Sequence, residues 1–175
     1  MTSADVIGFY TKLNRMGIKI WIDGGWGVDA LLGKQTRPHG DLDIAVEKKY
    51  VAQIRELLEA QGYKDVIKDD TSEWNFVLGD DHGRQIDVHA FVFDDQGNVK
   101  EGIKYPAGSL SGTGVIDGHA VNCISPEHMV KFHTGYKLRE SDLHDVAALC
   151  ERFGIEYPEE YVHLKKPRRP TKNIS

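Results

Sequence analysis

The chain has 175 residues, 40% of them hydrophobic, so it can bury one core but is too short for a large two-domain enzyme. It contains no apolar run long enough to span a membrane, and its N-terminus lacks the pattern of an export signal. Cys123 and Cys150 have the spacing of neither a zinc site nor a disulfide framework, so we expect buried free thiols in a cytoplasmic protein.

Charge is distributed unevenly along the chain. Residues 165–175 hold five of the 22 Lys and Arg and no acid, which predicts a basic, disordered tail. Residues 1–164 hold 17 basic against 27 acidic residues, a net charge of −10. Most of these carboxylates are explained as surface charges that keep the protein soluble. A negatively charged body also disfavours binding to nucleic acid phosphates and attracts cationic ligands.

The first third of the chain predicts helices and strands in alternation. Apolar residues recur at helical spacing in some segments, whereas others are short, apolar and rich in β-branched residues. Gly33 fits the C-terminal cap of the second helix. The predicted elements are a helix over residues 3–16, a strand over 18–22, a helix over 26–32, a strand over 41–46 and a helix over 51–61.

Strands dominate the next part of the chain, and helices follow. We expect strands over 63–67, 74–79 and 85–93, an irregular stretch over 94–111, a hairpin over 115–124, and helices beginning at Ser125 and spanning 141–153. This order predicts an α+β fold in which helices flank a mixed, twisted sheet. Residues 1–164 would form one domain, with a catalytic sheet core over about 1–124 and a helical C-terminal part over about 125–164.

Three aspartates fall on predicted strands. Asp41 and Asp43 stand two residues apart, so both side chains point to one side of their strand. Asp87 belongs to a later strand, which would complete the group if the two strands were neighbours. Clustered carboxylates need a cation, and Mg²⁺ commonly binds one or two carboxylates together with substrate phosphates.

A glycine pair makes this acid cluster more specific. An acid pair at a strand start is by itself more often a protective feature of a sheet edge. Gly24-Gly25, however, stands between a buried strand and a helix, where absent side chains let backbone N–H groups approach a phosphate. Glycine also serves ordinary tight turns, so the order of glycine pair, acid pair and strand aspartate carries the prediction.

Four segments of the chain together resemble the small antibiotic nucleotidyltransferases, the lincosamide and aminoglycoside 2″-adenylyltransferase-like group of the DNA polymerase β-like superfamily. They are WIDGGWGVDALLG at residues 21–33, TRPHGDLDI at 36–44, QIDVH at 85–89, and FHTGY at 132–136 with SDLHD at 141–145. The resemblance implies a polymerase β-like nucleotidyltransferase fold with a helical C-terminal part.

The resemblance also implies roles for individual residues. Asp41 and Asp43 would be metal ligands, and Asp87 a third ligand or the general base. Gly24 and Gly25 would cradle the triphosphate of ATP. Residues near the nucleotide phosphates would be Arg37 and His39. The wider superfamily usually has Gly-Ser where this chain has Gly-Gly, so a serine contact to phosphate is unavailable here.

Several other residues have both a structural and a functional interpretation. Trp26 beside the glycines, His89 on the face of Asp87, and Tyr136 between two helices are candidates to contact substrate. His144-Asp145 resembles the pair of metal phosphohydrolases, but the further ligands of such a site are not evident. Asp142 fits the start of a helix, where a negative charge interacts favourably with the helix dipole. Asp145 lies one turn further along and is a candidate to face the cleft.

These observations predict a Mg²⁺-dependent enzyme that transfers AMP from ATP to a hydroxyl of a small molecule, and the expected acceptor is an aminoglycoside or lincosamide antibiotic or a similar metabolite. The partners would be ATP and this acceptor, without nucleic acid or membrane, and the protein would be a monomer or homodimer. Two alternatives are AMP transfer to a protein target, disfavoured because a Gly-Ser-x-Ala-Arg-Gly motif is absent, and a non-catalytic nucleotide-binding module, disfavoured because all three acids are present.

Overall fold

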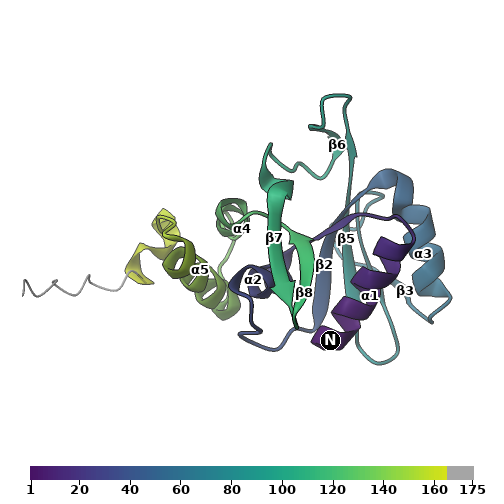
Figure 1. Cartoon of the computed structure of the whole chain (residues 1–175), viewed down its shortest axis with the longest axis horizontal. Coiled ribbons are helices and arrows are strands. Elements are labelled where there is room, and N and C mark those ends of the chain that lie inside the picture. The colour runs from purple at the N-terminus through teal and green to yellow at the C-terminus, as the bar shows by residue number, and fades with distance from the viewer. Residues whose placement is uncertain (165–175) are drawn as a thin grey trace, which may run out of the picture.

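An eight-stranded mixed sheet forms the centre of the computed structural model, which describes residues 1–164 (Figure 1). The strand order is β3-β4-β5-β2-β1-β8-β7, and β6 pairs with the end of β5. The strands are β1 Ile20–Ile22, β2 Asp41–Glu47, β3 Lys64–Val66, β4 Asn75–Gly79, β5 Gln85–Phe93, β6 Val99–Gly102, β7 Gly112–Ile116 and β8 His119–Cys123. The predicted basic tail over residues 165–175 lies outside the described residues.

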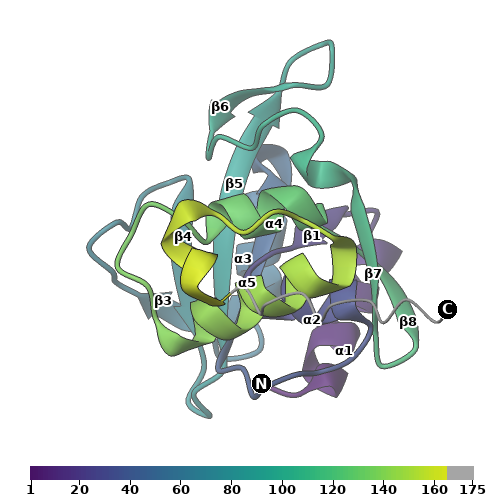
Figure 2. The ribbon, with the colours of Figure 1, turned by 90° about the vertical axis from the view of Figure 1, so that its left-hand side faces the viewer.

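Helices cover both faces of the sheet. In Figure 1, α4 and α5 lie on one side of the strands and α1 and α3 on the other, and Figure 2 shows α5 and α4 in front of the sheet. The helices are α1 Ser3–Arg15, α2 Gly24–Leu32, α3 Val51–Glu59, α4 Pro126–Phe132 and α5 Glu140–Phe153, with short 3₁₀ turns at Lys48–Tyr50, Ser109–Ser111 and Glu159–Leu164. The predicted α+β class with a mixed sheet and a helical C-terminal part is confirmed.

The central pair of strands, β2 and β5, fixes the geometry of the acids. They run parallel in an unbroken register from Asp41 opposite Gln85 to Glu47 opposite Phe91, which sets Asp43 opposite Asp87. Leu42 and the other even-numbered residues of β2 are fully buried, so the odd-numbered aspartates point to the opposite face. The condition under which Asp87 would approach the acid pair, that these two strands are neighbours, is therefore met.

Local signals explain most element boundaries. Thr2 and Asp5 form a capping box at the start of α1, and Gly33 ends α2 in the left-handed conformation. The hairpin of β7 and β8 turns at Asp117-Gly118, as predicted. Cys123 and Cys150 are buried free thiols, also as predicted.

Most element ends differ from the sequence prediction by a few residues, and two differences have a clear structural cause. The stretch over 94–111, expected to be irregular, contains β6 and a 3₁₀ turn, because β5 extends past the end of β4 and its last residues accept a new partner. Helix α2 begins at Gly24 rather than Trp26, because Asp23 caps it by accepting a hydrogen bond from the Gly24 N–H at 2.8 Å. No helix among residues 1–164 is long and apolar enough to cross a membrane.

Candidate active site

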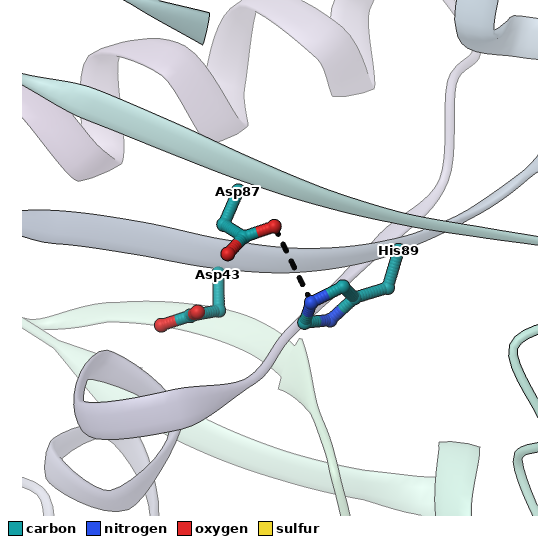
Figure 3. A group of neighbouring side chains, drawn as sticks. All are labelled: Asp43, Asp87 and His89. Carbon is teal, nitrogen blue, oxygen red and sulfur yellow. Dashed lines mark ion pairs between the residues drawn. The ribbon is translucent and has the colours of Figure 1, made fainter. Parts of the chain in front are cut away.

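Three side chains meet where β2 and β5 face helix α2. Ligand atoms of Asp43, Asp87 and His89 all lie within 4.8 Å of one another. Figure 3 shows the two carboxylates on neighbouring strands and the His89 ring turned toward Asp87. Asp41, on the same face of β2, is exposed at the strand's first residue and does not belong to this group, although its charge acts on Asp43.

A second layer of polar groups holds His89. Its Nε2 lies 3.4 Å from Asp87 Oδ1, and its Nδ1 lies 3.3 Å from the hydroxyl of Tyr105. That hydroxyl donates a hydrogen bond to Asp23 Oδ2 at 3.0 Å. Since Asp23 also caps α2, this chain of contacts links the metal-binding face of the sheet to the start of the helix.

The acids and the histidine shift one another's protonation. Burial raises the pKa of Asp43 to about 7, reinforced by repulsion from Asp41, Asp23 and Asp87 and opposed by His89. Burial alone would lower the pKa of His89, but contact with Asp87 and the charges of Asp23 and Asp43 raise it to about 9. At neutral pH His89 is therefore a cation beside these carboxyl groups.

This arrangement fits a divalent cation. Asp87 Oδ1 is buried and accepts no hydrogen bond from the described residues, since the 3.4 Å contact with His89 lacks hydrogen-bond geometry. Asp43 lies in a low-dielectric site among other acids that repel its negative charge. A bound cation would remove this unfavourable electrostatic energy. Two carboxylates from adjacent strands offer the hard oxygen ligands that such ions take.

Asp43 opens into a cleft of about 550 Å³, whose lining does not include Asp41 or Asp87. Asp23, Gly24 and Asp43 line one part of it, and His89 and Asn75 line the sheet floor. The rest comes from the segment after β6 and from the connection between α4 and α5, namely Ile103, Lys104, Tyr105, Phe132, His133, Thr134, Tyr136 and Arg139. The candidates His89 and Tyr136 therefore lie where a substrate would bind.

Gly24 is required by close packing against the metal-site carboxylate. Its φ is +55°, and a Cβ added there would lie 2.1 Å from Asp43 Oδ2. A Cβ at Gly25 would lie 2.5 Å from both Arg37 Nη2 and His39 Nδ1. Both glycines thus keep α2 close to its neighbours, and their role as a phosphate cradle stays a prediction.

Arg37 and His39, expected near the phosphates, have other partners in the structure. The Arg37 guanidinium donates to Asp145 at 2.7 to 3.3 Å, and Asp145 is only 1% exposed. His39 is buried with its Nε2 2.5 Å from Asp29. Neither residue lines the described cleft, and their contact with the nucleotide phosphates stays a prediction.

Trp26 also lies away from the cleft. Its side chain is 1% exposed and packs on His39 with ring centroids 4.6 Å apart, because α2 turns this position toward the loop before β2 rather than toward the acids. His144-Asp145 does not form a metal pair, since Asp145 is bound to Arg37. Asp142 caps α5 in a box with Arg139, the structural role predicted for it.

The sequence analysis did not identify Asp23, Tyr105 or Arg139 as site residues. Asp23 had a signal, since it ends the first strand directly before the glycine pair. Tyr105 and Arg139 lie in connections without periodicity, and only the tertiary fold brings them to the cleft.

A mixed sheet that aligns two aspartates on neighbouring strands beside a glycine-started helix defines a nucleotidyltransferase. The chain belongs to the aminoglycoside-2″-adenylyltransferase family, whose model matches residues 5–149. The predicted family is thereby confirmed, and with it an enzyme that uses a nucleoside triphosphate and a divalent metal.

Known relatives act on antibiotics. A lincosamide resistance protein of Staphylococcus haemolyticus is 32% identical over 155 residues, which make up 85% of this chain and 94% of the relative. A 2″-aminoglycoside nucleotidyltransferase of Escherichia coli is 29% identical over 115 residues, 65% of this chain and 62% of the relative.

Solved structures agree with these relatives. The lincosamide antibiotic adenylyltransferase LnuA, bound to lincomycin, superposes with a TM-score of 0.75 at 28% identity, covering 85% of this chain and 96% of LnuA. ANT(2″)-Ia in complex with adenylyl-2″-tobramycin gives a TM-score of 0.72 at 21% identity, with 86% and 88% of the two chains covered, and at that identity supports the fold alone.

Proposed function

We propose that this protein transfers AMP from ATP to a hydroxyl of a lincosamide or aminoglycoside antibiotic, with Mg²⁺ as its metal. The observation that carries the proposal is the register of β2 and β5, which sets Asp87 opposite Asp43, a residue that lines the cleft. Relatives named for lincosamide resistance and for 2″-aminoglycoside transfer support the choice of acceptor.

Asp43 and Asp87 would hold Mg²⁺, with Asp41 as a further ligand at the strand entrance. The metal would supply charge neutralisation for the triphosphate and polarise the α-phosphorus. Asp41 is exposed and two residues from Asp43 on the same face, so its carboxylate is free to turn toward a bound ion.

Asp87 would serve as general base for the acceptor. The acceptor oxygen bonds to the α-phosphorus, the bond to the β-phosphate oxygen breaks, and pyrophosphate leaves while the hydroxyl proton moves to Asp87. His89 is unsuited to that role because its raised pKa, about 9, keeps it protonated at neutral pH. It would instead donate hydrogen bonds in the cleft.

Aromatic and apolar side chains would bind the acceptor ring. Phe132 and Tyr136 line the cleft beside the acids, and Tyr136 is 43% exposed, which leaves its face available for stacking on a sugar. Location in the cytoplasm, the absence of nucleic acid or membrane partners, and a monomeric or homodimeric state stay predictions.

The test is incubation of the protein with ATP, Mg²⁺ and a panel of lincosamides and aminoglycosides. We expect pyrophosphate release and a product heavier than the antibiotic by one AMP, both lost in Asp87→Asn. Modification of a protein partner with no change in any antibiotic would overturn the choice of acceptor. Nucleotide binding without any transfer would instead favour a non-catalytic module.

A further inference from the structure

The connection between α4 and α5 places an arginine on the wall of the cleft. Arg139 is the N-cap residue of α5 and lines the same cleft as Asp43 and Gly24. Its side chain is 72% exposed, so much of the guanidinium is open to a ligand. The comparisons and the family motifs assign it no role.

A buried carboxylate orients this guanidinium. Arg139 donates to Asp142 through Nε at 3.3 Å and Nη2 at 3.0 Å, and its backbone N–H donates to the same carboxylate at 2.8 Å. Asp142 is 1% exposed; burial opposes its ionisation, but the hydrogen bonds from Arg139 prevail and hold its pKa below the usual value. The arginine is thus preorganised, with its remaining N–H groups unused by Asp142.

Two other basic side chains differ from Arg139 in position or in how firmly they are held. Arg37 is paired with Asp145, much as Arg139 is paired with Asp142, but it does not line the cleft. Lys104 lines the cleft and donates from Nζ to the Lys100 carbonyl at 2.9 Å, without a carboxylate partner among residues 1–164 to orient it. Among residues 1–164, Arg139 is the only arginine that lines this cleft.

Of the two proposed substrates, only ATP is a polyanion. Lincosamides and aminoglycosides present hydroxyl and amino groups, so an arginine in the cleft finds its natural anionic partner in the triphosphate. The leaving pyrophosphate gains negative charge as the bond to the α-phosphorus breaks, and a fixed guanidinium stabilises such charge better than a mobile lysine. Carboxylates on the opposite part of the cleft would repel the same phosphates, which increases the need for a cation.

We propose that Arg139 binds the β- and γ-phosphates of the nucleotide and stabilises the leaving pyrophosphate, and that Asp142 acts as its positioning residue. This proposal rests on the proposed function, since it assigns a contact within the same reaction. It gives the phosphate contact to the α4–α5 connection instead of to Arg37 and His39.

Nucleotide binding without acceptor tests the proposal. The variants are Arg139→Met, which keeps the apolar stem, Arg139→Lys, which keeps the charge, and Asp142→Asn; Arg152→Met, at the exposed far end of α5, is the matched control. Calorimetry measures the Kd of ATP with Mg²⁺ and the Kd of AMP for each, and thermal unfolding checks the fold.

We expect Arg139→Met to weaken Mg·ATP binding by about tenfold or more, the loss typical of a hydrogen bond between charged groups, and to leave AMP binding within about twofold. Arg139→Lys should recover part of the loss. Asp142→Asn should lower the preference for ATP over AMP, a ratio that a merely structural role would not move. Arg152→Met should match the wild type.

The outcomes separate this proposal from the proposed function. If the wild type binds Mg·ATP and Arg139→Met binds it equally well, the assignment of Arg139 is wrong while the enzyme activity stands. Equal losses for ATP and AMP, or a raised KM for the antibiotic alone, would also overturn it. If the wild type binds no nucleotide, the proposed function itself fails. If Arg139→Met lowers the Tm, the Kd of Mg·ATP for Arg139→Lys decides the question. Partial recovery of binding supports the proposal, and no difference from the wild type in the ATP-to-AMP preference of any Arg139 variant overturns it.

Discussion

Replacing Asp43 by asparagine should stabilise the metal-free protein. The pKa of this carboxyl rises from an ordinary 3.8 to about 7 on folding, so its contribution destabilises the fold progressively from pH 4 and fully above pH 7. This rise in pKa corresponds to an upper limit of about 4 kcal/mol of lost stability. His89 loses a favourable partner in the variant, which offsets part of the gain, so we expect about 1–2 kcal/mol at pH 8.

Denaturant unfolding with a chelator present, at pH 5 and pH 8, measures this difference. The gain from Asp43→Asn should be small at pH 5 and largest at pH 8, and Asp81→Asn, whose side chain is 88% exposed, should show no such trend. Added Mg²⁺ should stabilise the wild type and leave Asp43→Asn unchanged. A variant less stable than the wild type at pH 8 without metal would refute the reasoning, because it would mean that Asp43 is stabilised by its neighbours.

Three further substitutions test the surroundings of the acids. Tyr105→Phe should lower kcat about threefold to tenfold in steady-state assays and cost about 1 kcal/mol of stability, because it removes a buried hydrogen bond; unchanged kcat would contradict a positioning role. Arg37→Met should destabilise by about 3 kcal/mol in urea unfolding by leaving Asp145 unpaired, and adding Asp145→Asn should restore part of that loss. Gly24→Ala should abolish most transfer activity, whereas Gly118→Ala, with a similar positive φ but open space, should retain it.

The pairing of Asp41 with Asp43 was predictable because it depends only on residues within one strand. Alternation along β2 places Asp41 and Asp43 on one face, and the strand pattern around Asp87 makes it a candidate to join them. The register that aligns Asp43 with Asp87 depends on the pairing of segments over 40 residues apart, which only the family resemblance suggested.

Residues whose partners are distant in the chain could not be placed this way. Arg37 and Asp145 are separated by 108 positions, and nothing in either segment indicates the ion pair. Trp26 stands beside the glycine pair in the sequence, but the helix that starts at Gly24 rotates it into the core. In an α-helix the side chains of successive residues point in directions about 100° apart around the axis. A residue next to a site residue in the sequence therefore does not have to lie on the same face of the helix.

The contacts that oppose ionisation of Asp43 without metal also define the site proposed for a divalent cation. The β2–β5 ladder fixes the separation of the Asp43 and Asp87 backbones, and Gly24 leaves no room for a side chain beside Asp43. A carboxyl with a pKa of about 7 binds a proton in competition with the metal, so metal affinity should rise with pH up to that value and each binding event should release part of a proton. Under the proposed function, the ion that displaces this proton carries a larger charge and arrives as Mg²⁺ together with the triphosphate that Arg139 is proposed to bind.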